Sequence, residues 1–189
     1  MLPQTLLLTL LPLTLALPTS QEARACTGPT VNAATVSLIK EFEGFVASPA
    51  SDPIGLPTVG YGHQCTTSDC SEVPYSFPLS ESTATSLLMS DLVSPQQAIT
   101  LDTAAAVTLN ANEYGALVSW AYNVGNGNVA SSTLLSRLNA GEDALTVIEQ
   151  ELPKWDQAGG ETLPGLTRRR AAEVALAQTA TGVGAIPAC

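Results

Sequence analysis

The sequence contains few basic residues. Among 189 residues there are only 7 Lys and Arg against 17 Asp and Glu, which gives a formal net charge of -10. Proteins that bind nucleic acid neutralise its phosphates with Lys and Arg, so this balance argues against a nucleic-acid partner. Hydrophobic residues make up 45% of the chain, which is a globular composition. The length suits one domain with a proper core.

Histidine and cysteine are also scarce. His63 is the only histidine, and the four cysteines lack the ligand spacing of a zinc site, so we expect no metal. In a secreted chain, four cysteines suggest two disulfides, for which three pairings are possible. We expect a short loop closed by Cys65–Cys70 and a second bond, Cys26–Cys189, between the ends of the mature chain.

Long hydrophobic runs are limited to the stretch from Leu6 to Leu17. This run is too short and too interrupted by proline to span a membrane, but it suits a secretory signal. An A-x-A sequence at residues 23–25 favours cleavage before Cys26, although cleavage near Ala16 followed by a short pro-segment also fits. The alternative is a buried N-terminal helix. We predict a signal peptide over residues 1–25.

The remaining residues, 26–189, are expected to form a single domain that is secreted, extracellular and monomeric. No second apolar span occurs, so we expect no stable association with membranes. No feature of the sequence calls for a cofactor.

Apolar residues recur at helical spacing between Asn32, a plausible N-cap, and Gly44, a C-terminal stop. Short β-prone pieces broken by proline and glycine follow, which predicts a small sheet lobe over residues 45–80. Further helices are expected from Ser80 to Leu92, from Asn110 to Gly125, up to Gly141, from Ala144 to Leu152, and from a Thr167 cap to Gln178, with a loop over 155–165. The fold class is α+β, dominated by helices.

Glu43 stands at the end of the first helix, where unpaired carbonyl groups disfavour a carboxylate. Phe42 and Phe45 flank it and offer an apolar wall. Both effects are expected to raise the pKa of Glu43, as a general acid requires. The alternative interpretation of a single glutamate is an ordinary solvated surface residue.

Asp52 and Thr58 follow Glu43 at intervals of nine and six residues. Asp52 lies in a turn-rich segment that favours an ionised side chain, although Asp-Pro also commonly begins turns. Thr58 alone would be an ordinary strand threonine. An acid, a base and a hydroxyl together are sufficient to hydrolyse a glycosidic bond by attack of water.

This order of residues, completed by the Gly-Tyr-Gly-His that ends at His63, resembles the phage-type lysozymes of glycoside hydrolase family 24. Two later segments extend the resemblance, "YGALVSWAYNVGNGNVASSTLLSRLNAG" and "GGETLPGLTRRRAAE". It covers residues 31 to about 178. The resemblance implies a mainly helical lysozyme-like fold with a small three-stranded antiparallel sheet and a cleft between two lobes.

The resemblance also implies an activity, a lysozyme or muramidase. Glu43 would be the general acid, Asp52 would position and activate water, and Thr58 would be its hydroxyl partner. The substrate would be bacterial cell-wall peptidoglycan, cut at the β-1,4 bond between N-acetylmuramic acid and N-acetylglucosamine, and the reaction would invert the configuration at the anomeric carbon. His63 would be structural.

Three arginines, Arg168, Arg169 and Arg170, follow the expected Thr167 cap. Cations are disfavoured in the first turn of a helix, so a nearby anion is expected, either Glu43 or a carboxylate of the substrate. An arginine beside Glu43 would oppose a raised pKa. We therefore expect one of the three to orient Glu43 or to bind substrate.

Two other functions fit the same motifs. A lytic transglycosylase uses a similar glutamate, but its chemistry does not need Asp52 or Thr58. A non-catalytic protein that binds peptidoglycan on the same fold is the second alternative, and the intact set of three residues argues against it. Chitin is a further possible substrate.

Overall fold

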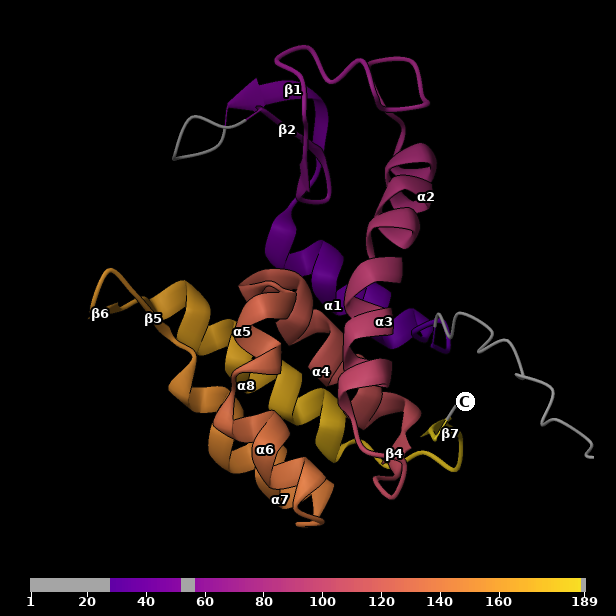
Figure 1. Ribbon diagram of the computed structural model, residues 1–189. Helices are drawn as coiled ribbons and strands as arrows, with labels where there is room; N and C mark the ends of the chain where they lie inside the picture. Colours follow the sequence, from indigo (N-terminus) through magenta and orange to yellow (C-terminus); the bar gives the residue numbers. More distant parts are fainter. Residues whose placement is uncertain (1–27, 52–56, 188–189) are drawn as a thin grey trace, which may run out of the picture.

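The computed structural model describes residues 28–51 and 57–187. They form a small sheet lobe and a larger helical lobe, which α2 (Glu81–Asp91) and α3 (Val93–Asp102) join as an almost continuous rod (Figure 1). The predicted fold class is confirmed.

The sheet lobe contains three antiparallel strands in the order β1 (Val46–Ser51), β2 (Pro57–Gly60) and β3 (His63–Gln64). In the register, Thr58 pairs with Ala50 on one side and with Gln64 on the other. The first helix, α1 (Ala33–Glu43), leads directly into β1. Glu43 therefore lies at the junction between the two lobes.

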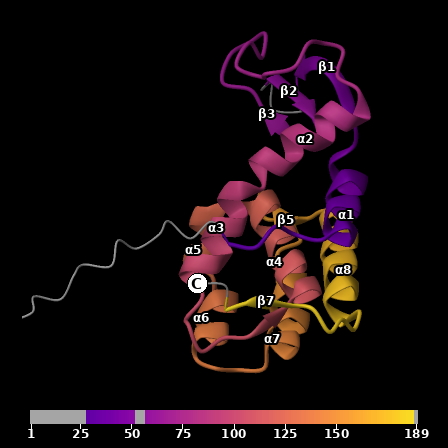
Figure 2. The ribbon, with the colours of Figure 1, turned by 90° about the vertical axis from the view of Figure 1, so that its right-hand side faces the viewer.

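The helical lobe is built around α4 (Ala111–Val124), most of whose side chains are buried. Around α4 lie α1, α3 and α8 (Pro164–Gln178), and α1 and α8 run side by side (Figure 2). Trp120, on α4, is completely buried within the helical lobe. The remaining elements are α5 (Asn126–Ala130), α6 (Thr133–Asn139), α7 (Ala144–Glu151), the 3₁₀ turn η1 (Leu152–Lys154), and the short strands β4 (Leu109–Asn110), β5 (Gln157–Ala158), β6 (Glu161–Thr162) and β7 (Gly184–Ile186).

The expected helix starts follow local capping chemistry in three cases. The side chains of Asn32, Ser80 and Asn110 each accept a hydrogen bond from a backbone N–H of the first turn. Glu113 completes a capping box with Asn110. Gly44 ends α1 with a φ of 73°, a conformation that favours glycine.

Other expectations were wrong. Thr167 does not cap the last helix: α8 begins three residues earlier, with Pro164 in its first turn, where a missing N–H costs nothing. Within the expected loop, β5 and β6 form a hairpin. The helices α3 and α5 were not predicted, because neither begins with a side-chain cap.

Among the described residues, no helix combines the length and the hydrophobicity that crossing a membrane requires. The expected signal peptide lies outside the described residues. The same is true of Cys26 and Cys189, whereas in the structure a disulfide joins Cys65 and Cys70.

Candidate active site

Glu43 is held by an arginine from the far end of the sequence. Nη1 of Arg169, on α8, donates a hydrogen bond of 2.6 Å to Oε1 of Glu43. The glutamate side chain is 20% exposed, whereas that of Arg169 is 5% exposed. A charge-assisted bond from a buried guanidinium fixes the carboxylate in one orientation while leaving it accessible.

A pocket of about 550 Å³ opens beside Glu43, between the two lobes. The sheet lobe contributes Gly62 and the two residues of β3, and α2 contributes Asp91. The other wall is the C-terminal end of α4 with the glycine that follows it: Tyr122, Asn123, Val124 and Gly125. Elements that are distant in sequence thus meet around two carboxylates, those of Glu43 and Asp91.

The second oxygen of Glu43 lies against the backbone of Gly62. A Cβ at Gly62 would be 2.8 Å from Oε2, and the residue has a φ of +86°. Glycine is therefore needed here for two reasons, the backbone conformation and the space that the carboxylate occupies. Nearby, Tyr122 donates a hydrogen bond of 2.9 Å to the carbonyl oxygen of Tyr61. Burial, with the negative charges of Asp91 and Glu43, raises the pKa of Tyr122.

His63 faces two carboxylates from different segments. Its Nδ1 lies 3.0 Å from both carboxylate oxygens of Asp91. Because an ionised carboxylate only accepts hydrogen bonds, Nδ1 carries the hydrogen. Nε2 is buried, has no hydrogen-bond partner among the described residues, and lies 3.9 Å from Oε1 of Glu72. Burial raises the pKa of Asp91, and the neighbouring His63 partly opposes this.

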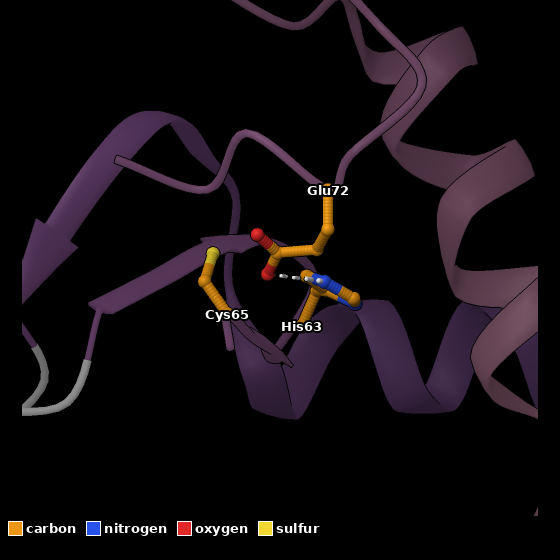
Figure 3. A group of neighbouring side chains, drawn as sticks. All are labelled: His63, Cys65 and Glu72. Atoms are coloured by element: carbon orange, nitrogen blue, oxygen red, sulfur yellow. Dashed lines mark ion pairs between the residues drawn. The ribbon is translucent and has the colours of Figure 1, made fainter. Parts of the chain in front are cut away.

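His63, Cys65 and Glu72 bring three potential metal ligands within 4.8 Å of one another (Figure 3). The sulfur of Cys65, however, is bonded to Cys70 and cannot act as a thiolate ligand. Glu72 already accepts hydrogen bonds from the backbone N–H of Thr66 and from the Thr67 hydroxyl. The donor set does not fit a resident metal, and we assign none.

The three arginines have different surroundings. Arg168 is exposed, and its guanidinium lies 5.4 Å from the ring centre of Phe42. Arg169 and Arg170 are 4% and 1% exposed, and both contact Glu173 on the same helix. We call Glu43, Arg169, Arg170 and Glu173 the inner cluster. Of the two expected partners, Glu43 or substrate, the structure shows a contact between Arg169 and Glu43. The triplet lies in the second turn of α8 and not in the first.

Of the two other predicted site residues, Asp52 and Thr58, the structure describes only Thr58. Asp52 lies outside the described residues. Thr58 lies on β2, half-buried, in the strand that leads to the Gly62 turn. The flanking phenylalanines contact other groups: Phe45 packs on Tyr61 in a tilted arrangement, and the guanidinium groups of Arg168 and Arg169 lie over Phe42.

A larger pocket, of about 680 Å³, lies near the start of α4. Its carboxylates already have structural partners. Glu113 accepts from the N-cap N–H of α4, Glu142 pairs with Arg137, and Asp143 caps α7. The smaller pocket, where Glu43 is accessible, is therefore the candidate active site.

The family model of phage lysozyme matches residues 40–173, a range that includes Glu43 and the inner cluster. The chain belongs to the phage lysozyme family. An endolysin of Bacillus phage PZA is 35% identical over 156 residues, which is 80% of this chain and 56% of that protein. The endolysin of Salmonella phage P22 is 32% identical over 140 residues, 71% of this chain and 89% of the relative. This phage lysozyme family member spans little more than half the length of its Bacillus phage relatives.

Solved structures agree with this assignment. A P22 lysozyme mutant superposes with a TM-score of 0.67 at 29% identity, covering 80% of this chain and 99% of that one. The muramidase domain of SpmX from Asticaccaulis excentricus gives a TM-score of 0.65, also at 29% identity, over 79% of this chain and 98% of the domain.

Several residues around Glu43 were not predicted from the sequence. Asp91, Tyr122 and Asn123 lie on helices whose amphipathic pattern says only which face is buried. Glu173 carried a signal that could have been used: it stands three and four residues after two arginines, a spacing at which side chains on a helix meet.

Proposed function

We propose that this phage lysozyme family member is a muramidase that hydrolyses the β-1,4 bond between N-acetylmuramic acid and N-acetylglucosamine in peptidoglycan. The observation that carries the proposal is the accessible carboxylate of Glu43, fixed by Arg169 at the junction of the two lobes. Similar proteins named as endolysins and as a muramidase domain support it.

In the proposed reaction, the carboxyl of Glu43 protonates the glycosidic oxygen as the bond to the anomeric carbon breaks. Since Arg169 occupies Oε1, the proton is delivered from Oε2. Asp52 accepts a proton from a water molecule that Thr58 helps to position, and the water attacks the anomeric carbon from the opposite face. Attack from that face inverts the configuration.

Loss of turbidity of bacterial cells, with wild type and Glu43→Gln, tests the proposal. We expect the amide to lower activity at least 10²-fold, because it cannot donate the proton. Glu41→Gln is the matched control, since Glu41 is an exposed glutamate on the same helix. Lysis that persists in Glu43→Gln would overturn the assignment of the acid.

The products distinguish the proposed hydrolysis from the transglycosylase alternative. Hydrolysis leaves a reducing N-acetylmuramic acid end, whereas a transglycosylase leaves an anhydro ring. We expect mass spectrometry of the soluble fragments to show reducing ends. For secretion, which we also propose, the mass of the protein recovered from the medium should correspond to a chain that begins near Cys26.

A further inference from the structure

Glu173 is a completely buried carboxylate beneath the site. It lies on α8 at 0% exposure. Its Oε1 accepts hydrogen bonds from Ser119 Oγ on α4 at 2.8 Å, from Arg169 Nε at 3.3 Å and from Arg170 Nη2 at 3.2 Å. Its Oε2 lies 2.9 Å from Arg170 Nε. Burying charges is costly, and pairing them often does not repay the whole cost of removing them from water. Nε and Nη1 of Arg170 and Oε2 of Glu173 are buried without a hydrogen-bond partner among the described residues, so this arrangement has a stability cost that needs a reason.

Both arginines extend from Glu173 to residues that line the pocket. The guanidinium of Arg169 spans the space between Glu173 and Glu43, with Nε on one carboxylate and Nη1 on the other. Arg170 donates from Nη2 to Oδ1 of Asn123 at 2.8 Å. One carboxylate therefore fixes two side chains, and each of these contacts a residue of the pocket.

The charges of the inner cluster balance. Two guanidinium groups face two carboxylates, and only Glu43 among the four is appreciably exposed. Without the charge of Glu173, two buried cations would face Glu43 alone. Each would favour its ionised form, which cannot donate a proton. Among the described residues, Asp91 on α2, Tyr122 on α4 and His63 on β3 are the titratable groups that line the pocket with Glu43. Lys40 lies in the last turn of α1, with its ammonium over the ring of Tyr61.

We propose that Glu173 is a positioning residue for the cleavage reaction, one that orients Arg169 and Arg170 toward the pocket and balances their charge beside the acid. This inference rests on the proposed function of Glu43. The guanidinium that lies 2.6 Å from Glu43 also contacts Glu173, so a second negative charge offsets part of the positive charge beside the acid.

The test is Glu173→Gln, which keeps the shape of the side chain but removes its charge. We expect kcat to fall roughly 10- to 100-fold through loss of orientation, with KM within about twofold of wild type. We also expect the upper limit of the active pH range to move to lower pH, because the unbalanced arginines favour ionised Glu43. A structural role alone would not move this limit.

Glu151→Gln is the matched control. The Glu151 side chain is 5% exposed and accepts hydrogen bonds from Arg137 and Lys154. We call Arg137, Glu142, Glu151 and Lys154 the outer cluster. Glu151 does not line the Glu43 pocket. This control should lower stability without moving the pH profile.

A folded Glu173→Gln protein with the kcat and pH profile of wild type would overturn the inference. If that variant does not fold, the neutral pair Arg170→Gln with Glu173→Gln decides: a lowered kcat supports the proposal, and a wild-type kcat overturns it. Failure of the proposed function is distinguishable, because it would appear as lysis by Glu43→Gln whatever Glu173→Gln does.

Discussion

The inner and outer clusters each combine two basic side chains with two glutamates, but they differ in exposure. In the inner cluster, the side chains of Arg170 and Glu173 are 1% and 0% exposed. In the outer cluster, those of Arg137 and Lys154 are 22% and 62% exposed. The inner cluster ends at the pocket, whereas the outer cluster ties the end of α6 to α7 and η1.

The pKa shifts of the two clusters have opposite directions. In the outer cluster, Arg137 lowers the pKa of Glu142, and Lys154, followed by Arg137, lowers that of Glu151. In the inner cluster, burial raises the pKa of Glu173 and lowers that of Arg170. Oppositely charged partners near solvent favour the ionised form of a side chain, whereas burial disfavours that form. The inner cluster is therefore a poor way to gain stability, which is consistent with a role at the site.

The two clusters should differ most in how much the free energy of unfolding falls when one arginine is removed from each. Arg169→Gln leaves Glu173 with one fewer cation in a buried position, and we expect it to lower the free energy of unfolding by about 3–5 kcal/mol. Arg137→Gln acts near solvent and should have a much smaller effect. Urea denaturation of both variants measures this, and equal losses would contradict the comparison.

Alanine substitutions at two glycines, one beside the inner cluster and one beside the outer cluster, extend the comparison of the two regions. Gly62→Ala and Gly141→Ala introduce the same side chain at nearly the same φ, +86° and +84°, but only at Gly62 does the new Cβ meet another group, Oε2 of Glu43. Both should lose about 1 kcal/mol or more through backbone strain. Only Gly62→Ala should also lower kcat, by about tenfold or more, because it displaces the acid. Steady-state kinetics beside thermal melts separate the two effects, and equal kcat values would exclude the displacement.

The pH dependence of stability should have opposite signs in the two clusters. The lowered pKa of Glu151 means that its contribution is present above the ordinary value of 4.5 and is lost as the pH falls. The stability advantage of wild type over Glu151→Gln should therefore shrink toward acid pH. For Glu173, whose pKa is raised, the advantage of wild type should grow as the pH falls from 7 toward 4.5.

Melting temperatures of the three proteins between pH 4 and pH 7 would measure this. Two trends of the same sign would show that burial does not distinguish the clusters.

The smallest effect on stability is expected from a substitution in the exposed loop that holds Glu72, where hydrogen bonds rather than an arginine stabilise the carboxylate. The Thr67 hydroxyl, 2.6 Å from Glu72 Oε2, is the largest cause that lowers the pKa of Glu72 to about 2. Thr67→Val should raise this pKa toward 4.5. At neutral pH the stability should hardly change, because the affected loop is exposed. Carboxyl NMR chemical shifts followed with pH would measure the change, and a titration still centred near 2 would assign the shift to other donors.

Much of the fold was predictable because its signals are local. Asn32, Ser80 and Asn110 each supply the atom that caps the helix they begin. The start of α8 was misplaced because Thr167 resembles a cap, whereas Pro164 begins the helix and the Thr167 hydroxyl bonds to Leu163 and Asp156. A capping residue in the sequence does not show whether the chain upstream is already helical.

The site was predictable only in part, for the same reason. Glu43 could be singled out because its unusual feature, a carboxylate at a helix end, is local. The distinction among the three arginines is not local: α8 must pack on α1 and α4 before Arg169 can reach Glu43 and Arg170 can reach Asn123. The catalytic roles of Glu43, Asp52 and Thr58 stay predictions.

The sequence by itself determined the helix caps, the small sheet, the Cys65–Cys70 loop and the acidic residue at the end of α1, because each depends on residues a few positions apart. Only the tertiary structure decided which arginine contacts that acid, which glutamate balances the arginine, and which glycine makes room for it. Those contacts join residues up to 126 positions apart, and their energies depend on burial, which no short segment of sequence specifies.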